Sequence, residues 1–205
     1  ELYKGSQTDI ASYAWNKLGG ENTENGSNTW STSLLNKTNL NINFIKYIGE
    51  TWSSKIAEHT WIVGGNTLDN IYYKIPSVAY QNEILKSDAS NSTDNSKTYT
   101  TKIGLMYVSD YAFATPSSYW NTRLENYSNN TLRNNNWMYM GMGELTITRN
   151  SEASTYVFNL YNSGKANDGT ATGYYPVRQT FYLKQTIEYV SGTGTQSDPY
   201  RVKWT

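Results

Sequence analysis

Cysteine is absent from this sequence of 205 residues, and histidine occurs once, at His59. Without cysteine the chain forms no disulfide and offers no thiolate for catalysis or metal binding. A Ser-His-Asp triad or a histidine-based metal site would have to be built around His59 alone. Cysteine-free domains are ordinary among proteins exported by Gram-positive bacteria, so this absence favours such a source.

Charged residues are scarce at 17% of the chain, and its 17 basic residues balance its 17 acidic ones. Binding of nucleic acid or electrostatic docking on a membrane would require a basic patch, so we expect neither partner. No run approaches the roughly 18 apolar residues of a transmembrane helix, and we expect no membrane insertion by this segment. The sequence starts at Glu1 with neither Met nor a leader, which indicates a mature or trimmed fragment.

Tyrosine and tryptophan are abundant instead, with 19 Tyr and 7 Trp against 4 Phe. Both combine an apolar face with a polar tip and tolerate half-buried positions and wet interfaces. Much of the remainder is Asn, Ser, Thr and Gly, which favour turns and strands. This composition is typical of secreted β-rich proteins, so we expect a secreted or cell-surface protein.

Helical periodicity is clearest in residues 29–58, where apolar residues recur from Leu34 to Trp52. We expect this stripe to face the core, with Asn36–Asn41 dividing the region into two short helices. A further short helix should begin near Ser109–Asp110 and end before Pro116. The other predictions for this part are a strand at 71–75 stopped by Pro76, a mobile loop at 87–98, a buried strand at 102–108 and irregular structure at 117–136.

The last third of the chain alternates between apolar and polar residues. Leu145 and Ile147 alternate with Thr146 and Thr148, which indicates a half-buried antiparallel strand. Further predictions are a strand at 156–160, a strand with Val177, Phe181 and Leu183 opposite Arg178, Thr180 and Tyr182, turns at 162–164 and 167–169, and a closing hairpin from Ile187 to Trp204.

These elements predict an α+β protein with short N-terminal helices packed on a twisted antiparallel β-sheet. A single domain spanning 1–205 is the simplest division, because neither a linker nor an internal repeat is visible. Residues 1–98 would form its helical and loop-rich half, and residues 99–205 its β-rich half.

Four stretches stand out in this order: WSTSLL (30–35), KIGLMYVSDYAFA (102–114), NNWMY (135–139), and YPVR (175–178) followed by SGTGT (191–195) and DPYR (198–201). Together they resemble a group of exported or cell-surface proteins of Firmicutes gut bacteria, many of which carry a prepilin-type segment. The C-terminal half of that group resembles the C-type-lectin-like fold in its formylglycine-generating-enzyme variant. This resemblance implies a compact domain for carbohydrate or protein binding. The chemistry of that enzyme needs cysteines, which this chain lacks.

Catalytic signatures are missing from the sequence: it has no Gly-x-Ser-x-Gly elbow, His-Glu-x-x-His motif or P-loop. We expect His59 to be a packed residue. A glycosidase needs two carboxyl groups across a cleft, and Asp110, Glu125 and Glu144 are conceivable, although Asp110 is better explained as a helix-start residue. We therefore predict no catalytic residue, metal site or cofactor, and leave calcium binding open.

Aromatic residues concentrate in the C-terminal β region. Tyr and Trp among Asn and Ser combine contact area with adaptable hydrogen bonding, as sugar-binding and paratope-like surfaces do. Arg178 could contact a ligand or hold an ion pair that fixes the C-terminal strand, and the ion pair is favoured. The candidate ligand-binding residues are Trp137, Tyr139, Tyr156, Tyr161, Tyr174, Tyr175 and Arg178.

The leading hypothesis is a non-enzymatic extracellular surface or appendage module, such as a pilin-like subunit or adhesin, which acts by binding or assembly. One alternative is a free-standing, carbohydrate-binding, lectin-like domain, and another is a glycan-directed enzyme. The partner would be a host or bacterial glycan, a surface protein, or copies of the chain itself in an appendage.

Overall fold

The computed structural model describes residues 12–16, 26–85, 97–195 and 197–204. The loop predicted at 87–98 lies outside these ranges up to residue 96, and Thr98 already belongs to a strand. The helices are η2 (Trp30–Thr32), η3 (Leu35–Phe44), α1 (Ile45–Ser53), α2 (Leu68–Tyr72), α3 (Pro76–Tyr80), η4 (Gln81–Leu85), α4 (Val108–Phe113), η6 (Ser117–Tyr119), η7 (Leu124–Ser128) and α5 (Asn130–Asn134). The strands are β1 (Ser12–Ala14), β2 (His59–Ile62), β3 (Thr98–Thr101), β4 (Ile103–Gly104), β5 (Glu144–Arg149), β6 (Tyr156–Leu160), β7 (Ala166–Thr170), β8 (Tyr174–Pro176), β9 (Thr180–Phe181), β10 (Ile187–Ser191) and β11 (Arg201–Trp204).

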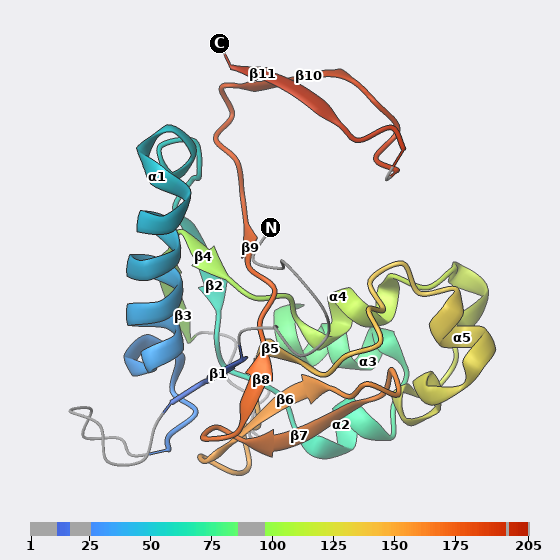
Figure 1. Ribbon diagram of the computed structural model, residues 1–205. Coiled ribbons are helices and arrows are strands. Elements are labelled where there is room, and N and C mark those ends of the chain that lie inside the picture. The colour runs from blue at the N-terminus through green and yellow to red at the C-terminus, as the bar shows by residue number, and fades with distance from the viewer. Residues whose placement is uncertain (1–11, 17–25, 86–96, 196, 205) are drawn as a thin grey trace.

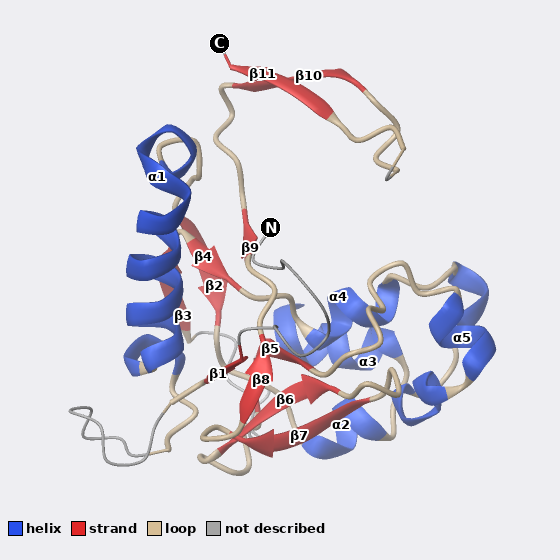
Figure 2. Ribbon diagram, in the orientation of Figure 1, coloured by secondary structure: helices blue, strands red, loops and turns tan. Residues whose placement is uncertain are grey.

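The predicted α+β class is confirmed, because the described chain contains both helices and small antiparallel sheets, with the strands β5 to β11 gathered after the last helix (Figure 2). The strands form several small sheets in place of the one twisted sheet that the sequence predicted. Strands β5, β6 and β7 make a three-stranded sheet, while β1–β8, β2–β3, β4–β9 and β10–β11 are separate antiparallel pairs. The ladders are short, since β4 and β9 share two residue pairs.

Strand β5 is buried on both faces, whereas its alternation predicted one face in water. Leu145 and Ile147 belong to one apolar cluster, and Thr146 and Thr148 on the opposite face are buried too. The two threonines tolerate burial because each hydroxyl donates a hydrogen bond, Thr146 to the carbonyl of Phe158 and Thr148 to the carboxylate of Glu83. The polar residues at every second position of β5 therefore do not mark a solvent-exposed face.

Two apolar clusters lie against this central sheet and make up the core. The first gathers Trp15, Trp30, Leu35, Leu40, Ile56, Trp61, Ile103, Leu105, Leu145, Ile147, Val157 and Ala171. The second gathers Ile71, Ala79, Met106, Val108, Tyr111, Ala112, Leu124, Tyr127, Leu132, Phe158, Leu160 and Ala166.

The helical region does not break at Asn36–Asn41, contrary to the prediction. Both residues lie inside the π-helix η3, and their side chains bond to groups outside the helical ladder. Asn36 donates to the carbonyl of Trp30, and Asn41 pairs with both the N–H and the carbonyl of Ile103. The departure from helical geometry falls at Gly49, whose φ of 76° suits glycine.

The apolar stripe of this region is only partly core. Leu35 and Ile56 are buried, and Phe44, Ile45 and Ile48 pack on the first cluster. Ile42 and Trp52 are exposed instead, which corrects the prediction for those two residues. Helical spacing fixes which side chains share a face, and it leaves open whether the whole face is covered.

Residues 71–75 were predicted as a strand, and that prediction is wrong. Residues Leu68–Tyr72 form α2, because Thr67 caps this helix by accepting a hydrogen bond from the N–H of Asn70. Pro76 opens the following helix, α3, at its first position, where its missing N–H costs nothing. The cap outweighs the strand preference of the Ile-Tyr-Tyr run.

Three further predictions need correction and two are confirmed. The strand predicted at 102–108 is limited to β4, since Val108 begins α4, and residues 117–136 contain η6, η7 and α5. Residues 167–169 lie within β7 instead of forming a turn, because Asn162–Gly164 already makes the turn between β6 and β7, as predicted. The closing hairpin is confirmed as β10 and β11.

Asn28 fastens the turn between β5 and β6 to the rest of the fold. Its side-chain amide is buried and donates to the carbonyls of Asn150, Ala153 and Tyr156 at 2.8, 2.9 and 2.6 Å. Its backbone N–H donates to Ser154 at 2.7 Å. The side chain thereby gives these backbone carbonyls a further donor, beside the backbone N–H groups that reach Ala153 and Tyr156.

Replacing Asn28 with Asp should lower the free energy of unfolding by about 3 kcal/mol. The carboxylate has the same size as the amide but cannot donate, so an acceptor oxygen would face these carbonyls. Chemical denaturation measures the loss. Asn121→Asp is the matched control, since Asn121 is exposed. Equal stability of the two variants would contradict the role assigned to Asn28.

Candidate functional site

A groove of about 450 Å³ lies beside the loop that follows α5, and it is the candidate ligand site. Trp137 is its most prominent residue, with 79% of its surface exposed. Aromatic rings, two thioethers, a carboxylate and a hydroxyl surround the space. The lining residues are Tyr80, Met106, Asp110, Phe113, Ala114, Trp137, Met138 and Thr180.

Asn136 holds the Trp137 loop in place. Its buried amide donates to the carbonyl of Tyr111 at 2.9 Å and accepts from the N–H of Met138 at 2.9 Å. The N–H of Trp137 donates to Ala114, at the end of α4. These bonds hold the backbone on both sides of Trp137, whose indole is exposed.

Arg178 fixes the other side of this loop through an ion pair with Glu144, the role that the sequence favoured. Its Nε donates to one carboxylate oxygen at 3.0 Å and its Nη2 to the other, while Nη2 also donates to the carbonyl of Met138 at 3.0 Å. Burial raises the pKa of Glu144, and the guanidinium opposes that shift. The ion pair therefore offsets part of the cost of burying the Glu144 carboxylate.

Asp110 contributes the carboxylate of the groove and also starts α4. Its side chain accepts a hydrogen bond from the N–H of Tyr107 at 2.8 Å, in agreement with the predicted helix-start role. Burial raises the pKa of Asp110, and the hydrogen bond from Tyr107 opposes this. The other acids singled out by the sequence also have partners, Glu144 with Arg178 and Glu125 with Arg123 at 3.6 Å.

Glu83 is a buried carboxyl group that the sequence did not reveal. It accepts hydrogen bonds from the N–H of Ser109 at 3.0 Å and from the hydroxyl of Thr148. Burial raises its pKa to about 7, against the effect of these bonds, and the charge of Asp110 adds to the increase. No local motif marks this position, because its partners come from α4 and β5.

The seven predicted ligand residues do not form one surface. Trp137 lines the groove, and Arg178 supports its loop from behind. The hydroxyl of Tyr139 donates to Asn162 at 2.7 Å, and that of Tyr161 accepts from Asn167 at 3.2 Å. Tyr175 packs on the first core cluster, whereas Tyr156 and Tyr174 are exposed on β6 and β8.

The sequence missed most of the groove. Tyr80 comes from α3, Met106 precedes α4, and Thr180 belongs to β9, so only the tertiary fold unites them. His59 takes no part in the groove and packs as predicted, with its ring stacked on Tyr182 at 4.0 Å. Burial lowers the pKa of His59, which keeps this ring neutral near pH 7.

A flat aromatic face beside a carboxylate and a hydroxyl suits a ligand with one apolar face and several hydroxyl groups. Comparisons with protein-family models, with curated proteins and with solved structures found no match to this chain. The resemblance to exported Firmicutes proteins therefore stays a prediction. Within the described ranges, no helix has both the length and the apolar character needed to cross a bilayer.

Removing the guanidinium with Arg178→Met should reduce the free energy of unfolding by about 3–5 kcal/mol, since Glu144 would be buried without a counter-charge. Thermal or chemical denaturation measures the loss. The double variant Arg178→Met with Glu144→Leu should recover most of it, because no charge is then left buried. A double variant as unstable as the single one would show that charge burial is not the cause.

Glu83 should make the protein less stable as the pH rises. The folded chain binds the proton of Glu83 more tightly than the unfolded chain does, so the free energy of unfolding falls between about pH 4.5 and about 7. The part due to Glu83 amounts to roughly 3 kcal/mol. It should disappear from the pH–stability curve of Glu83→Gln, while Asp110 and Glu144 keep their smaller contributions. Identical curves for both proteins would contradict this assignment.

Proposed function

We propose that this chain is a non-enzymatic extracellular surface or appendage module, secreted or displayed on a cell, and that the Trp137 groove binds a glycan. The observation that carries the proposal is the exposure of Trp137 over a groove that also contains Asp110 and Thr180. The exposed indole leaves a large apolar surface in contact with water, which is unfavourable. A ligand that covered this surface would remove that cost. Sugars offer the matching combination of an apolar ring face and hydroxyl groups.

The composition and the resemblance support the same proposal. A cysteine-free chain rich in Tyr, Asn, Ser and Thr fits an exported contact module. We include in this proposal a C-type-lectin-like arrangement of the α+β fold, which the resemblance implies. A glycan-directed enzyme is disfavoured, because Asp110, Glu125 and Glu144 each have a structural partner.

A second candidate is an appendage subunit that assembles with copies of itself. The observation in its favour is the hairpin β10–β11, which projects from the body of the molecule (Figure 1). None of the hairpin residues that the structure describes lines the Trp137 groove, so the two proposals involve different surfaces.

Glycan-array binding tests the groove. The protein should bind a subset of glycans, and Trp137→Ala should weaken that binding by at least about tenfold, the effect of losing about 1.4 kcal/mol of contact. Tyr174→Ala is the matched control, because Tyr174 is an exposed aromatic residue outside the groove.

Two results would overturn the proposal. One is an array without any bound glycan, and the other is an equal loss in Trp137→Ala and Tyr174→Ala. Cleavage of a bound glycan during the assay would replace the binding module with the enzymatic alternative.

A further inference from the structure

The C-terminal hairpin exposes several large apolar side chains. Tyr189 and Tyr200 have 66% and 67% of their surfaces exposed, and Val190 and Val202 are exposed beside them. The ribbon leaves the body after β9 and carries the hairpin away from it (Figure 1). A lone two-stranded hairpin is marginally stable in water, so a partner surface would stabilise this one.

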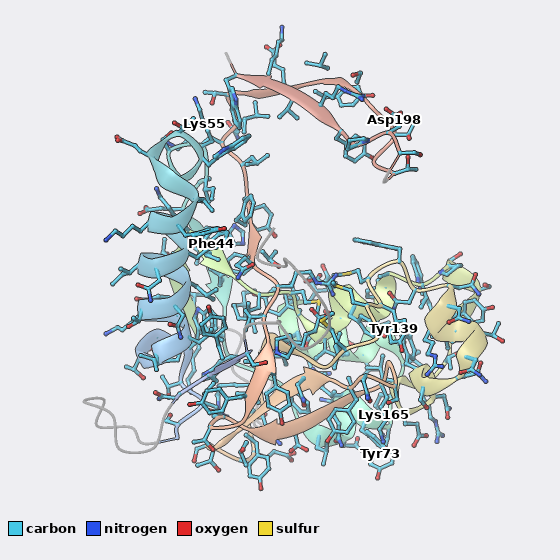
Figure 3. The ribbon with its side chains drawn as sticks, viewed as in Figure 1. Phe44, Lys55, Tyr73, Tyr139, Lys165 and Asp198 are labelled. Carbon is cyan, nitrogen blue, oxygen red and sulfur yellow. The ribbon has the colours of Figure 1, made fainter. Side chains whose placement is uncertain are left out.

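The hairpin is nevertheless a well-defined element. Ile187 lies opposite Trp204 and Tyr189 opposite Val202 in the antiparallel register, and the rings of Tyr189 and Tyr200 lie edge to face at 6.1 Å. The N–H groups of Thr193 and Gly194 both donate to the carbonyl of Asp198, which lies at the tip (Figure 3). It therefore presents a preformed surface to a partner.

The charges of the hairpin are paired with one another. Lys203 contacts Glu188 at 2.9 Å across the strands, and Arg201 contacts Asp198 at 3.0 Å. A partner would therefore not have to supply counter-charges, and an apolar surface without charged groups fits this hairpin best.

Such a surface exists elsewhere on the same chain. A groove of about 440 Å³ lies between the helical segment η3–α1 and the extended segment that contains β9. Its rim includes Tyr47, which has 69% of its surface exposed, and Trp52, which has 59%. The described residues that line it include none with a charge: they are Phe44, Tyr47, Ile48, Trp52, Ile56, Gln179, Phe181 and Leu183.

The groove is not filled by the hairpin of its own chain. Trp204 stands edge to face against Trp52 at 6.0 Å, and the ammonium of Lys55 lies 4.8 Å from the Trp204 ring. Lys55 lies beside the base of the hairpin, at the end of α1, while Asp198 lies at the distant tip (Figure 3). The base is thereby fixed at one end of the groove, and the strands lead away from it.

We propose that the hairpin of one copy docks in the apolar groove of a second copy. Both surfaces are apolar, and neither leaves an unpaired charge to be buried. Since the two surfaces differ, the contact is heterologous, and repetition of it links copies head to tail. The inference rests on the second candidate function, self-assembly through the hairpin, and names the surface that receives the hairpin. It does not depend on the Trp137 groove, so the glycan proposal and this one can fail independently.

Sedimentation velocity over a range of concentrations tests the contact. The wild-type protein should form oligomers whose size grows with concentration. A hairpin variant, Tyr189→Lys with Val202→Lys, and a groove variant, Tyr47→Lys with Leu183→Lys, should each associate at least about tenfold more weakly, because each brings charge into an apolar contact. Tyr174→Lys should assemble like the wild type, since that residue belongs to neither surface.

Mixing the two variants gives the decisive result. The hairpin variant keeps an intact groove and the groove variant keeps an intact hairpin, so an equimolar mixture should form heterodimers that do not grow further. Nonspecific association would not be restored by mixing these two variants. Either of two results would overturn the head-to-tail contact. One is a wild type that stays monomeric at a protein concentration of about 100 μM, because its dissociation constant would then be too high for assembly. The other is a mixture that forms no heterodimer.

Discussion

The fold depends on one constraint, the burial of β5 on both of its faces. A strand in that position has to satisfy every polar side chain that it carries, because an unpaired buried group costs more than a typical hydrogen bond gains. Thr148 meets this demand through Glu83, and Glu144 meets it through Arg178. The arrangement brings η4 to one end of the strand and the segment after β8 to the other.

The segment from Arg178 to Leu183 connects the buried strand β5 with the surface. Its side chains alternate, so Thr180 lines the Trp137 groove while Gln179, Phe181 and Leu183 line the apolar groove. Because Arg178 anchors the segment to Glu144 and also bonds to Met138, both grooves depend on the same buried ion pair. One extended strand thus separates a mixed aromatic and polar surface from an uncharged one.

The sequence predicted those features that depend on local chemistry. The α+β class, the turn at Asn162–Gly164, the closing hairpin and the Arg178 ion pair all follow from nearby residues or from simple pairing rules. The predictions were wrong where a helix cap was overlooked or where distant partners decide: Thr67 caps α2 and makes a strand-like run helical, and Glu83 makes β5 a two-sided core strand. The Trp137 groove was out of reach for the same reason, because its walls come from separate elements.

Asparagine is abundant in this chain, and its side chains connect distant segments, a role that ion pairs have in many other proteins. Asn28, Asn41 and Asn136 each join distant backbone segments through neutral amides. Mobile ions screen a Coulombic contact, but they leave such amide bonds almost unaffected, and amides neither gain nor lose protons over the ordinary pH range. The contacts that these three asparagines make should therefore be equally stable at high and at low salt.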